Sequence, residues 1–368
     1  MNVQSLLTTL LLIVFSLGLS GQAGQTYITF EGTMGVGRGQ HIVLVSGDEE
    51  YRSEEALPQL ARILAYRHGF KTTVLFAQNP QYPGVVDPNY RDHIAGTELL
   101  ATADLMVIFT RFRSLPASEM KNFEEFLKSG KPVVAIRTAT HAFEFGKKES
   151  SYAHWSNFHD QEGDFWDGGF GRAILGERWY THHGHHKHQS TRGLIDPFSR
   201  NHPILRGIED GQIWGATDVY GVRLPLPGDA LPLILGQTID RSGAYDEDDL
   251  FYGLSPNDHA VASKNPGSGK DYNPNDPLMP IAWTKSYQLP DGKKGMAFTS
   301  TIGSSVDLLN EGVRRLIINA VIHLSGLEVP QKTVVDLVGD YQPTQFNFHT
   351  DEYWQEKKLL ISDIQNKE

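Results

Sequence analysis

Apolar runs of strand length alternate with helix patterns in the first part of the chain, and this alternation restricts the fold more than any other feature. The run His41–Ser46 precedes a helix pattern that begins near Ser53 and stops at Gly69. Further strands are predicted over Thr72–Phe76, Asp104–Thr110 and Val133–Ile136, with helices over 98–101 and 116–128. Strands and helices that alternate at this spacing form parallel sheets with right-handed crossovers. The sequence therefore predicts an α/β fold: a flavodoxin-like, doubly wound, mostly parallel sheet with helices on both faces and long loop insertions.

The second half of the chain continues the sheet pattern but carries long loops. Strand patterns resume over Gly211–Leu224, Ala230–Gln237, Met279–Trp283 and Gly295–Thr299, and a helix is predicted over Val306–Leu324. Residues 150–200 are rich in His, Gly and Trp, and we expect them to form loop insertions that face the ligand crevice. The stretch from Tyr252 to Pro277 is long for a structureless loop, so we expect either a lid or a disordered loop. One α/β domain over 41–330 and a C-terminal extension over 331–368 follow from these patterns.

The stretch from Lys131 to Phe145 changes abruptly from apolar to polar where a predicted buried strand ends. The polar residues after the strand are Arg137, Thr138, Thr140 and His141. Ligands of doubly wound sheets bind at the carboxyl ends of the strands, so these side chains are placed to meet a ligand. We therefore predict all four as catalytic candidates, with His141 or a loop histidine as the general base. The alternative is a polar turn that only satisfies backbone groups.

Charge and cysteine content exclude several classes of function. The net charge is -11, with 44 acidic against 33 basic residues, so attraction to nucleic acids or to anionic membranes is not expected. A small carbohydrate-type ligand fits this composition better. The chain contains no cysteine, which excludes disulfides, thiolate metal sites and a cysteine nucleophile.

One loop contains five histidines within seven positions, and they are His182, His183, His185, His186 and His188. In an extended loop, His183 and His185 would share one face and the other three would share the opposite face. Several imidazoles beside a carboxylate would suit zinc or a similar divalent ion. No motif such as HExxH fixes the ligand spacing, so a metal site, a contact with sugar hydroxyls and a solvated loop remain three alternatives. The metal hypothesis takes His182, His183 and His185 as ligands.

Polar residues near other predicted strand ends are candidates for ligand binding. The residues after the first strand, Asp48 to Arg52, could line the same crevice, although charged residues in such turns often only cap a helix. Asp218 could supply an acid, and Arg192 could hold ligand oxygens. The set comprises Asp48, Tyr51, Arg52, Arg192, Asp218 and Ser304.

The N-terminus resembles a secretory signal. An uncharged apolar core runs from Leu6 to Leu19 and is followed by Ser-Gly-Gln-Ala, which predicts a signal peptide over 1–23 and a mature chain that begins near Gly24. A short membrane anchor is the alternative, but the core is short for a spanning helix. We therefore expect a periplasmic or secreted protein that is free of the membrane after cleavage.

Several segments in order resemble the ThuA-like (trehalose utilisation) family of the class I glutamine amidotransferase-like superfamily. They are VVAIRTATHAF, NHPILRGI at Asn201–Ile208, PIAWTKSY at Pro280–Tyr287, and KGMAFTSTIGSS with the following VRRLIINAVIHLSGLEVP. The resemblance covers roughly residues 41–330 and implies a flavodoxin-like sheet and a role in carbohydrate metabolism.

Two departures limit what the resemblance implies. Glutamine amidotransferases use a cysteine at the elbow that corresponds to Arg137-Thr138, so their ammonia-releasing chemistry cannot operate in this chain. Many relatives carry a histidine where this chain has Ser304. We expect a protein that acts on a sugar or sugar derivative at the strand-end crevice. The alternative is a non-catalytic carbohydrate-binding module, which should show an open aromatic groove instead of converging titratable groups.

Overall fold

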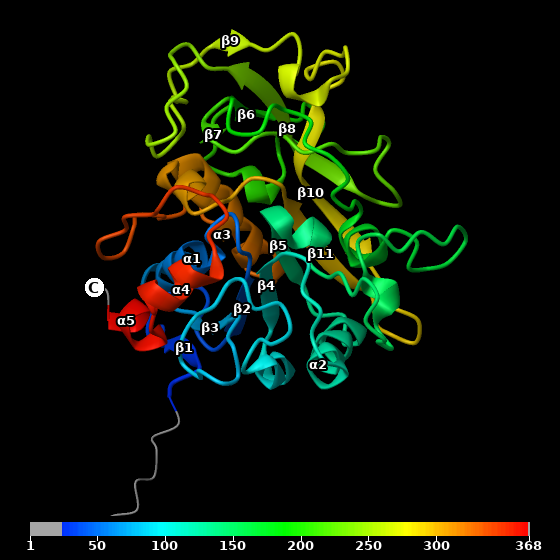
Figure 1. The fold of residues 1–368 in the computed structure, drawn as a ribbon, viewed down its shortest axis with the longest axis vertical. Helices are drawn as coiled ribbons and strands as arrows, with labels where there is room; N and C mark the ends of the chain where they lie inside the picture. The colour runs from blue at the N-terminus through cyan, green and yellow to red at the C-terminus, as the bar shows by residue number, and fades with distance from the viewer. Residues whose placement is uncertain (1–23, 367–368) are drawn as a thin grey trace, which may run out of the picture.

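The computed structural model describes residues 24–366, so the predicted signal peptide over 1–23 lies outside the described residues. Within the described range, the chain forms one mixed sheet of 11 strands with helices on both faces (Figure 1). The predicted α/β class is confirmed. No helix in residues 24–366 is long and apolar enough to cross a membrane.

Five parallel strands form the centre of the sheet in the order β3-β2-β4-β5-β11. Numbered along the chain, this is the order 2-1-3-4-5 of flavodoxin-like folds. Every residue of β4 and β5 is buried, because helices cover both faces of a parallel sheet. The bounds are β2 His41–Gly47, β3 Lys71–Phe76, β4 Leu105–Thr110, β5 Val133–Ile136 and β11 Gly295–Ser300.

Antiparallel strands extend this centre on both sides. β1 pairs with β3 at one edge, while β10, β8, β6 and β7 continue from β11, and β9 pairs with β8. Their bounds are β1 Tyr27–Phe30, β6 Gln189–Ile195, β7 Ile213–Gly215, β8 Leu231–Asp240, β9 Ala260–Val261 and β10 Met279–Tyr287.

Two details of the antiparallel half differ from the sequence prediction. Residues 150–200 were expected to be loop, but β6 lies inside this range, because its polar segment is hydrogen-bonded to β8 on one side and β7 on the other. The strand expected over Gly211–Leu224 is reduced to the three residues of β7, and the polar residues after it form a turn.

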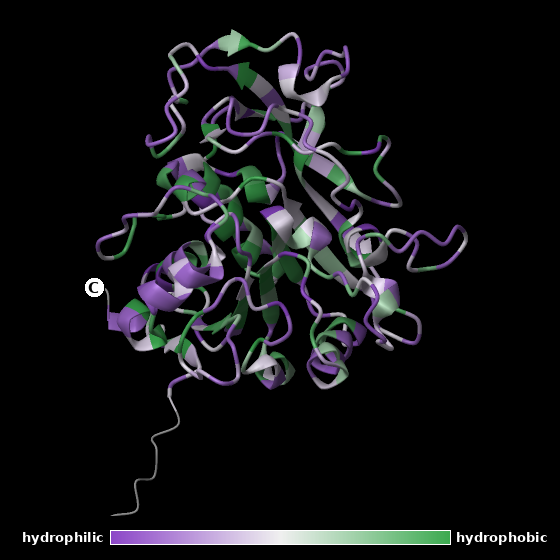
Figure 2. Cartoon of the chain, viewed as in Figure 1, coloured by the Kyte–Doolittle hydropathy of each residue, from purple (hydrophilic) through white to green (hydrophobic). Residues whose placement is uncertain are grey.

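The helices cover the two faces of the sheet. α1 (Ser53–His68) and α3 (Glu311–Leu324) pack on one face, and α2 (Ala117–Lys128) packs on the other. The predicted helix over 306–324 is divided: a 3-10 turn precedes Asn310, whose side chain accepts a hydrogen bond from the amide of Val313 and caps α3. Figure 2 shows hydrophobic residues along the central strands and polar residues on the outer loops.

The C-terminal extension returns to the body of the protein. Its helices, α4 (Asp351–Lys357) and α5 (Ile361–Asn366), lie beside α1 and β1 (Figure 1). The Arg62 guanidinium donates to the carbonyl of Ile364, and the Val86 amide donates to the carbonyl of Leu359 at 2.9 Å. The extension therefore packs against the domain and does not project from it.

Candidate functional site

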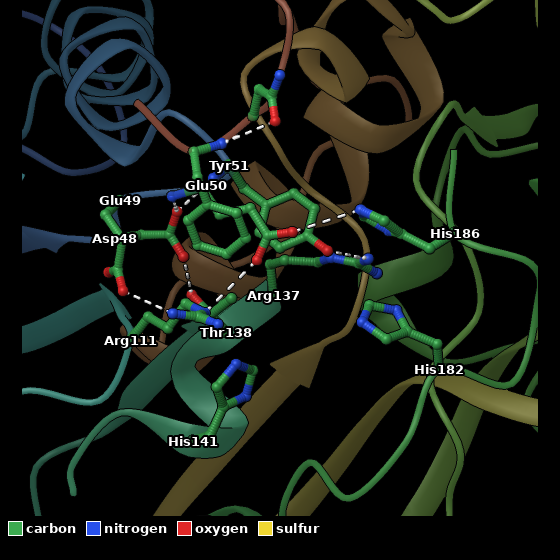
Figure 3. Close-up of polar contacts among 12 residues, drawn as sticks. Asp48, Glu49, Glu50, Tyr51, Arg111, Arg137, Thr138, His141, His182 and His186 are labelled. Carbon is green, nitrogen blue, oxygen red and sulfur yellow. Dashed lines mark hydrogen bonds and ion pairs between the residues drawn. The ribbon is translucent and has the colours of Figure 1, made fainter. Parts of the chain in front are cut away.

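Polar side chains from four segments meet beyond the carboxyl ends of the parallel strands (Figure 3). The turn after β2 contributes Asp48 to Tyr51, and a 3-10 turn, Arg137–His141, follows β5. Asp218 follows β7, and the histidine loop contributes His182 and His186. Strand ends in a doubly wound sheet converge in this way because the parallel strands all finish at the same edge.

Asp218 is the centre of the site and is fully buried. Its Oδ2 lies 2.8 Å from Nδ1 of His182, and its Oδ1 lies 3.0 Å from Nδ1 of His186 and 3.1 Å from the Arg137 guanidinium. Burial opposes ionisation of Asp218, but the charge and hydrogen bond of His182 outweigh it and hold the pKa of Asp218 well below its usual range. Because an ionised carboxylate only accepts hydrogen bonds, both Nδ1 atoms carry their protons.

Arg137 anchors this carboxylate and is itself fully buried. Its guanidinium also donates to the carbonyl oxygens of Asp218 at 2.8 Å and Thr301 at 2.6 Å, and to the Tyr51 hydroxyl at 3.0 Å. The Tyr51 and Tyr220 rings lie 4.4 and 3.8 Å from it. Arg137 was predicted as a catalytic candidate, but its guanidinium already donates to these protein groups, and this arrangement fixes Asp218.

The pKa values of the two histidines on Asp218 are shifted in opposite directions. Burial lowers the pKa of His182, but the Asp218 charge and hydrogen bond overcome this effect and raise the pKa above its ordinary value. For His186, burial dominates and lowers the pKa. Neutral His186 then presents its unprotonated Nε2 to Glu50, whose Oε1 is 3.4 Å away.

Glu50 is a site residue that the sequence reasoning did not select. Burial raises its pKa to about 7, although the nearby Arg111 works in the opposite direction. Its Oε1 faces His186, and its Oε2 lies 3.5 Å from the Arg111 guanidinium (Figure 3). The signal in the sequence was the acidic run Asp48-Glu49-Glu50 at the end of a predicted strand. One carboxylate is enough to cap the following helix, so three in a row indicated a further role.

Asp48 and Thr138 join the turns after β2 and β5. The Thr138 hydroxyl donates to Asp48 Oδ2 at 2.6 Å, and the amides of Glu50 and Tyr51 donate to Oδ1. Burial and the neighbouring Glu49 raise the pKa of Asp48. Both polar groups point at each other, so the structure gives them a structural contact rather than an open position toward a ligand.

His141 lies beside this centre in an aromatic setting. Its ring centroid is 4.8 Å from Phe112, 5.2 Å from Trp179 and 6.1 Å from Tyr220, and only 3% of the residue is exposed. Burial, followed by the charge of Arg111, lowers the pKa of His141 well below its usual value, so the imidazole is neutral. The Thr140 hydroxyl lies 3.2 Å from its Nδ1. Because its pKa is lowered, this imidazole accepts a proton less readily than an ordinary histidine does, and its role as a general base stays a prediction.

Other predicted site residues lie outside this centre. His183 Nε2 lies 3.0 Å from the carbonyl of Pro274, while the His185 ring stacks on His188. The Arg192 guanidinium donates to three backbone carbonyls, and the Ser304 hydroxyl accepts from the amide of Asp307 at 3.3 Å. These contacts turn the four side chains away from Asp218, while His183 and His185 still line the adjoining cavity, so their roles in ligand binding stay predictions.

The residues that could hold a metal ion in the structure differ from the predicted ligands. Ligating atoms of His182, His186 and Asp218 all lie within 4.8 Å of one another. The predicted set shared only His182 with this group. The alternation of side chains in an extended loop, which puts His182 and His186 on one face, was the signal that could have found the pair.

A cavity of about 730 Å³ adjoins the histidine loop. One wall comes from the loop 252–277, where the Asn265 amide and the Tyr272 hydroxyl donate to the carbonyl of His183 at 3.0 and 2.5 Å. This loop is therefore a defined wall of the site. Aromatic rings and imidazoles line the cavity, including Trp179, Tyr180, His182, His186 and Tyr272.

Comparisons with known proteins give a likeness to two solved structures. A ThuA-like protein from Bacteroides uniformis ATCC 8492 shares 14% identity at a TM-score of 0.39, over 80% of this chain and 95% of the other. A ThuA-like protein from Parabacteroides merdae ATCC 43184 shares 13% identity at a TM-score of 0.41, over 86% of this chain and 98% of the other. No family model and no curated protein matches the sequence.

Proposed function

We propose that this chain is a ThuA-like enzyme that acts on a sugar or sugar derivative by proton transfer. The observation that carries the proposal is the convergence of perturbed titratable groups beside one cavity. His182 with a raised pKa and His186 with a lowered one both hydrogen-bond to the buried Asp218. Glu50, with a pKa of about 7, faces His186, and His141, with a lowered pKa, lies beside Trp179. Such clusters are typical of acid–base sites, whereas a binding module needs no such arrangement.

The geometry indicates a role for each group. Asp218 holds the Nδ1 proton of His182, which leaves Nε2 as the atom that can exchange a proton with a ligand. His182 lines the cavity, so its proton is within reach of a bound molecule. The rings of Trp179, Tyr180 and Tyr272 offer apolar faces against which sugar rings can pack. The ligand we propose is therefore a small carbohydrate.

A divalent metal at His182, His186 and Asp218 is the second candidate. Two imidazole nitrogens and a carboxylate oxygen within 4.8 Å of one another fit the donor set of zinc and leave a position for substrate. The Arg137 guanidinium lies 3.1 Å from Asp218 Oδ1, and its positive charge would repel a metal ion bound at this carboxylate. When bound, such an ion would polarise a sugar oxygen or activate a water molecule.

The test is a screen for chemical change. Protein freed of metal with EDTA, and the same protein with zinc restored, is incubated with trehalose, glucose and their oxidised derivatives in D2O. Proton NMR then reports hydrolysis, isomerisation or exchange of C–H for C–D. We expect conversion of at least one sugar by the wild type and none by His182→Gln. Binding of a sugar without any conversion would instead support the non-catalytic binding module.

The zinc arm of this screen separates the two catalytic proposals. Activity that survives EDTA treatment supports acid–base chemistry by the side chains alone. Activity that returns only with zinc, together with about one bound ion per chain that is lost in His186→Gln, supports the metal centre. His183→Ala is the matched control for the zinc content, because the Nε2 of this imidazole lies 3.0 Å from the Pro274 carbonyl and does not face Asp218.

We also propose a periplasmic or secreted location, on the basis of the apolar N-terminal segment. N-terminal sequencing of the protein from its native host is expected to find a chain that begins near Gly24. An intact Met1 in the membrane fraction would contradict this proposal.

A further inference from the structure

The C-terminal extension reaches into the candidate site. Its segment 341–350 has no regular secondary structure and contacts the turn after β2, where Phe346 is fully buried. The Phe346 ring stacks on Tyr51 with centroids 5.3 Å apart, and it lies 5.7 Å from His186. Tyr252, at the start of the cavity loop, meets the same ring edge-on at 5.1 Å. One ring of the extension therefore contacts three separate segments of the site.

Hydrogen bonds hold the segment at Thr344, two residues before Phe346, and at Phe346 itself. The amide and hydroxyl of Thr344 donate to the two carboxylate oxygens of Glu55 at 2.8 and 2.7 Å. The Tyr252 hydroxyl donates to the carbonyl of Phe346 itself. The position of the ring is thus set by α1 and by the loop wall, independently of the histidines.

The residue after Phe346, Asn347, is hydrogen-bonded to the histidine loop. Lys187 Nζ donates to Asn347 Oδ1 at 3.0 Å, and the Arg52 guanidinium donates to the Asn347 carbonyl at 3.0 Å. Arg52 is fully buried and has a left-handed backbone with φ of 60°. It was predicted to bind ligand, but its contacts show that it fastens the extension beside the site.

Two of the three rings that Phe346 touches, those of His186 and Tyr51, have polar ends that build the site. His186 donates Nδ1–H to Asp218, and the Tyr51 hydroxyl accepts from Arg137. Each hydrogen bond fixes one end of its ring, and packing against Phe346 fixes the apolar faces. We propose that Phe346 is a positioning residue of the site, and that the C-terminal extension is a working part of it. This inference concerns the site of the proposed function, but it does not depend on which reaction that site performs.

The test compares two buried residues of the same extension. Phe346→Ala and the conservative Phe346→Leu are made in the full-length mature chain, with Ile364→Ala as the matched control. Ile364 is a buried residue of α5, the helix that contacts β1. The readout is the ring 15N resonances of His186 at constant pH, assigned with His186→Gln, together with the melting temperature of each variant.

We expect Phe346→Ala and Ile364→Ala both to lower the melting temperature, while only Phe346→Ala shifts or broadens the His186 signals. Phe346→Leu should restore most of the native His186 signal. Unchanged His186 signals in Phe346→Ala and Phe346→Leu, or an equal change in Ile364→Ala, would overturn the inference and leave Phe346 as ordinary core packing. Because no substrate enters this experiment, a failed carbohydrate screen would refute the proposed function without affecting this result.

Discussion

Replacing Arg137 with methionine is expected to destabilise the protein by about 4 kcal/mol, because it breaks a buried ion pair and leaves Asp218 without its permanent cation. Arg137 and Asp218 are both fully buried. The substitution also removes the donors to the carbonyl oxygens of Asp218 and Thr301. Deleting one partner of a buried pair costs roughly 3–5 kcal/mol, and we take the lower part of this range for the pair since His182 still faces the carboxylate. The unpaired carbonyls add about 1 kcal/mol or more.

A double-mutant cycle with Asp218→Asn tests the cause of this loss. The double variant Arg137→Met/Asp218→Asn contains no stranded charge, so we expect it to lose less stability than the sum of the two single variants by about 1–3 kcal/mol. Urea unfolding followed by tryptophan fluorescence gives the four free energies. Additive losses, or a cost below about 1 kcal/mol for Arg137→Met, would refute the reasoning and show that water or a rearranged side chain compensates the carboxylate.

Three further predictions follow from buried polar groups. Burial raises the pKa of Glu54 to about 7, so the folded state holds an extra proton between about pH 4.5 and 7 and loses stability as the pH rises through this window. We therefore expect Glu54→Gln to stabilise the protein in urea unfolding by at most about 3 kcal/mol at pH 8 and to have no such effect at pH 4. An equal effect at both pH values would contradict the assignment. Thr138→Val removes the 2.6 Å hydrogen bond to Asp48 and should cost about 2 kcal/mol, measured by the same method with Thr138→Ser as the control that keeps the hydroxyl. The sequence suggested His183 and His185 as metal ligands, but neither imidazole faces Asp218, so we expect the double variant His183→Ala/His185→Ala to keep its zinc content in elemental analysis. A loss of zinc would instead support the ligand set predicted from the sequence.

The sequence alone was sufficient to predict the central part of the fold. Buried parallel strands need continuous apolar runs, and the helices between them need one apolar face. Both patterns can be read from residues that are close together in the sequence. For this reason the strands at His41 and Val133 and the helix after Ser53 were found where the structure has them. The polar strand β6 was missed, because it is held by hydrogen bonds to its neighbours and has no apolar run of its own.

The candidate site was only partly contained in the sequence. Strand-end position pointed to Arg137 and Asp218, because parallel strands finish together, and the histidine run pointed to His182; the structure brings the three together. Which atoms face each other was decided by the tertiary structure. The charge and hydrogen bond of His182 keep the buried Asp218 ionised, whereas burial raises the pKa of Glu50 to about 7, and neither environment is visible in a local pattern. The contact of Phe346 with Tyr51 joins residues almost 300 positions apart, and only the path of the folded chain could bring them together.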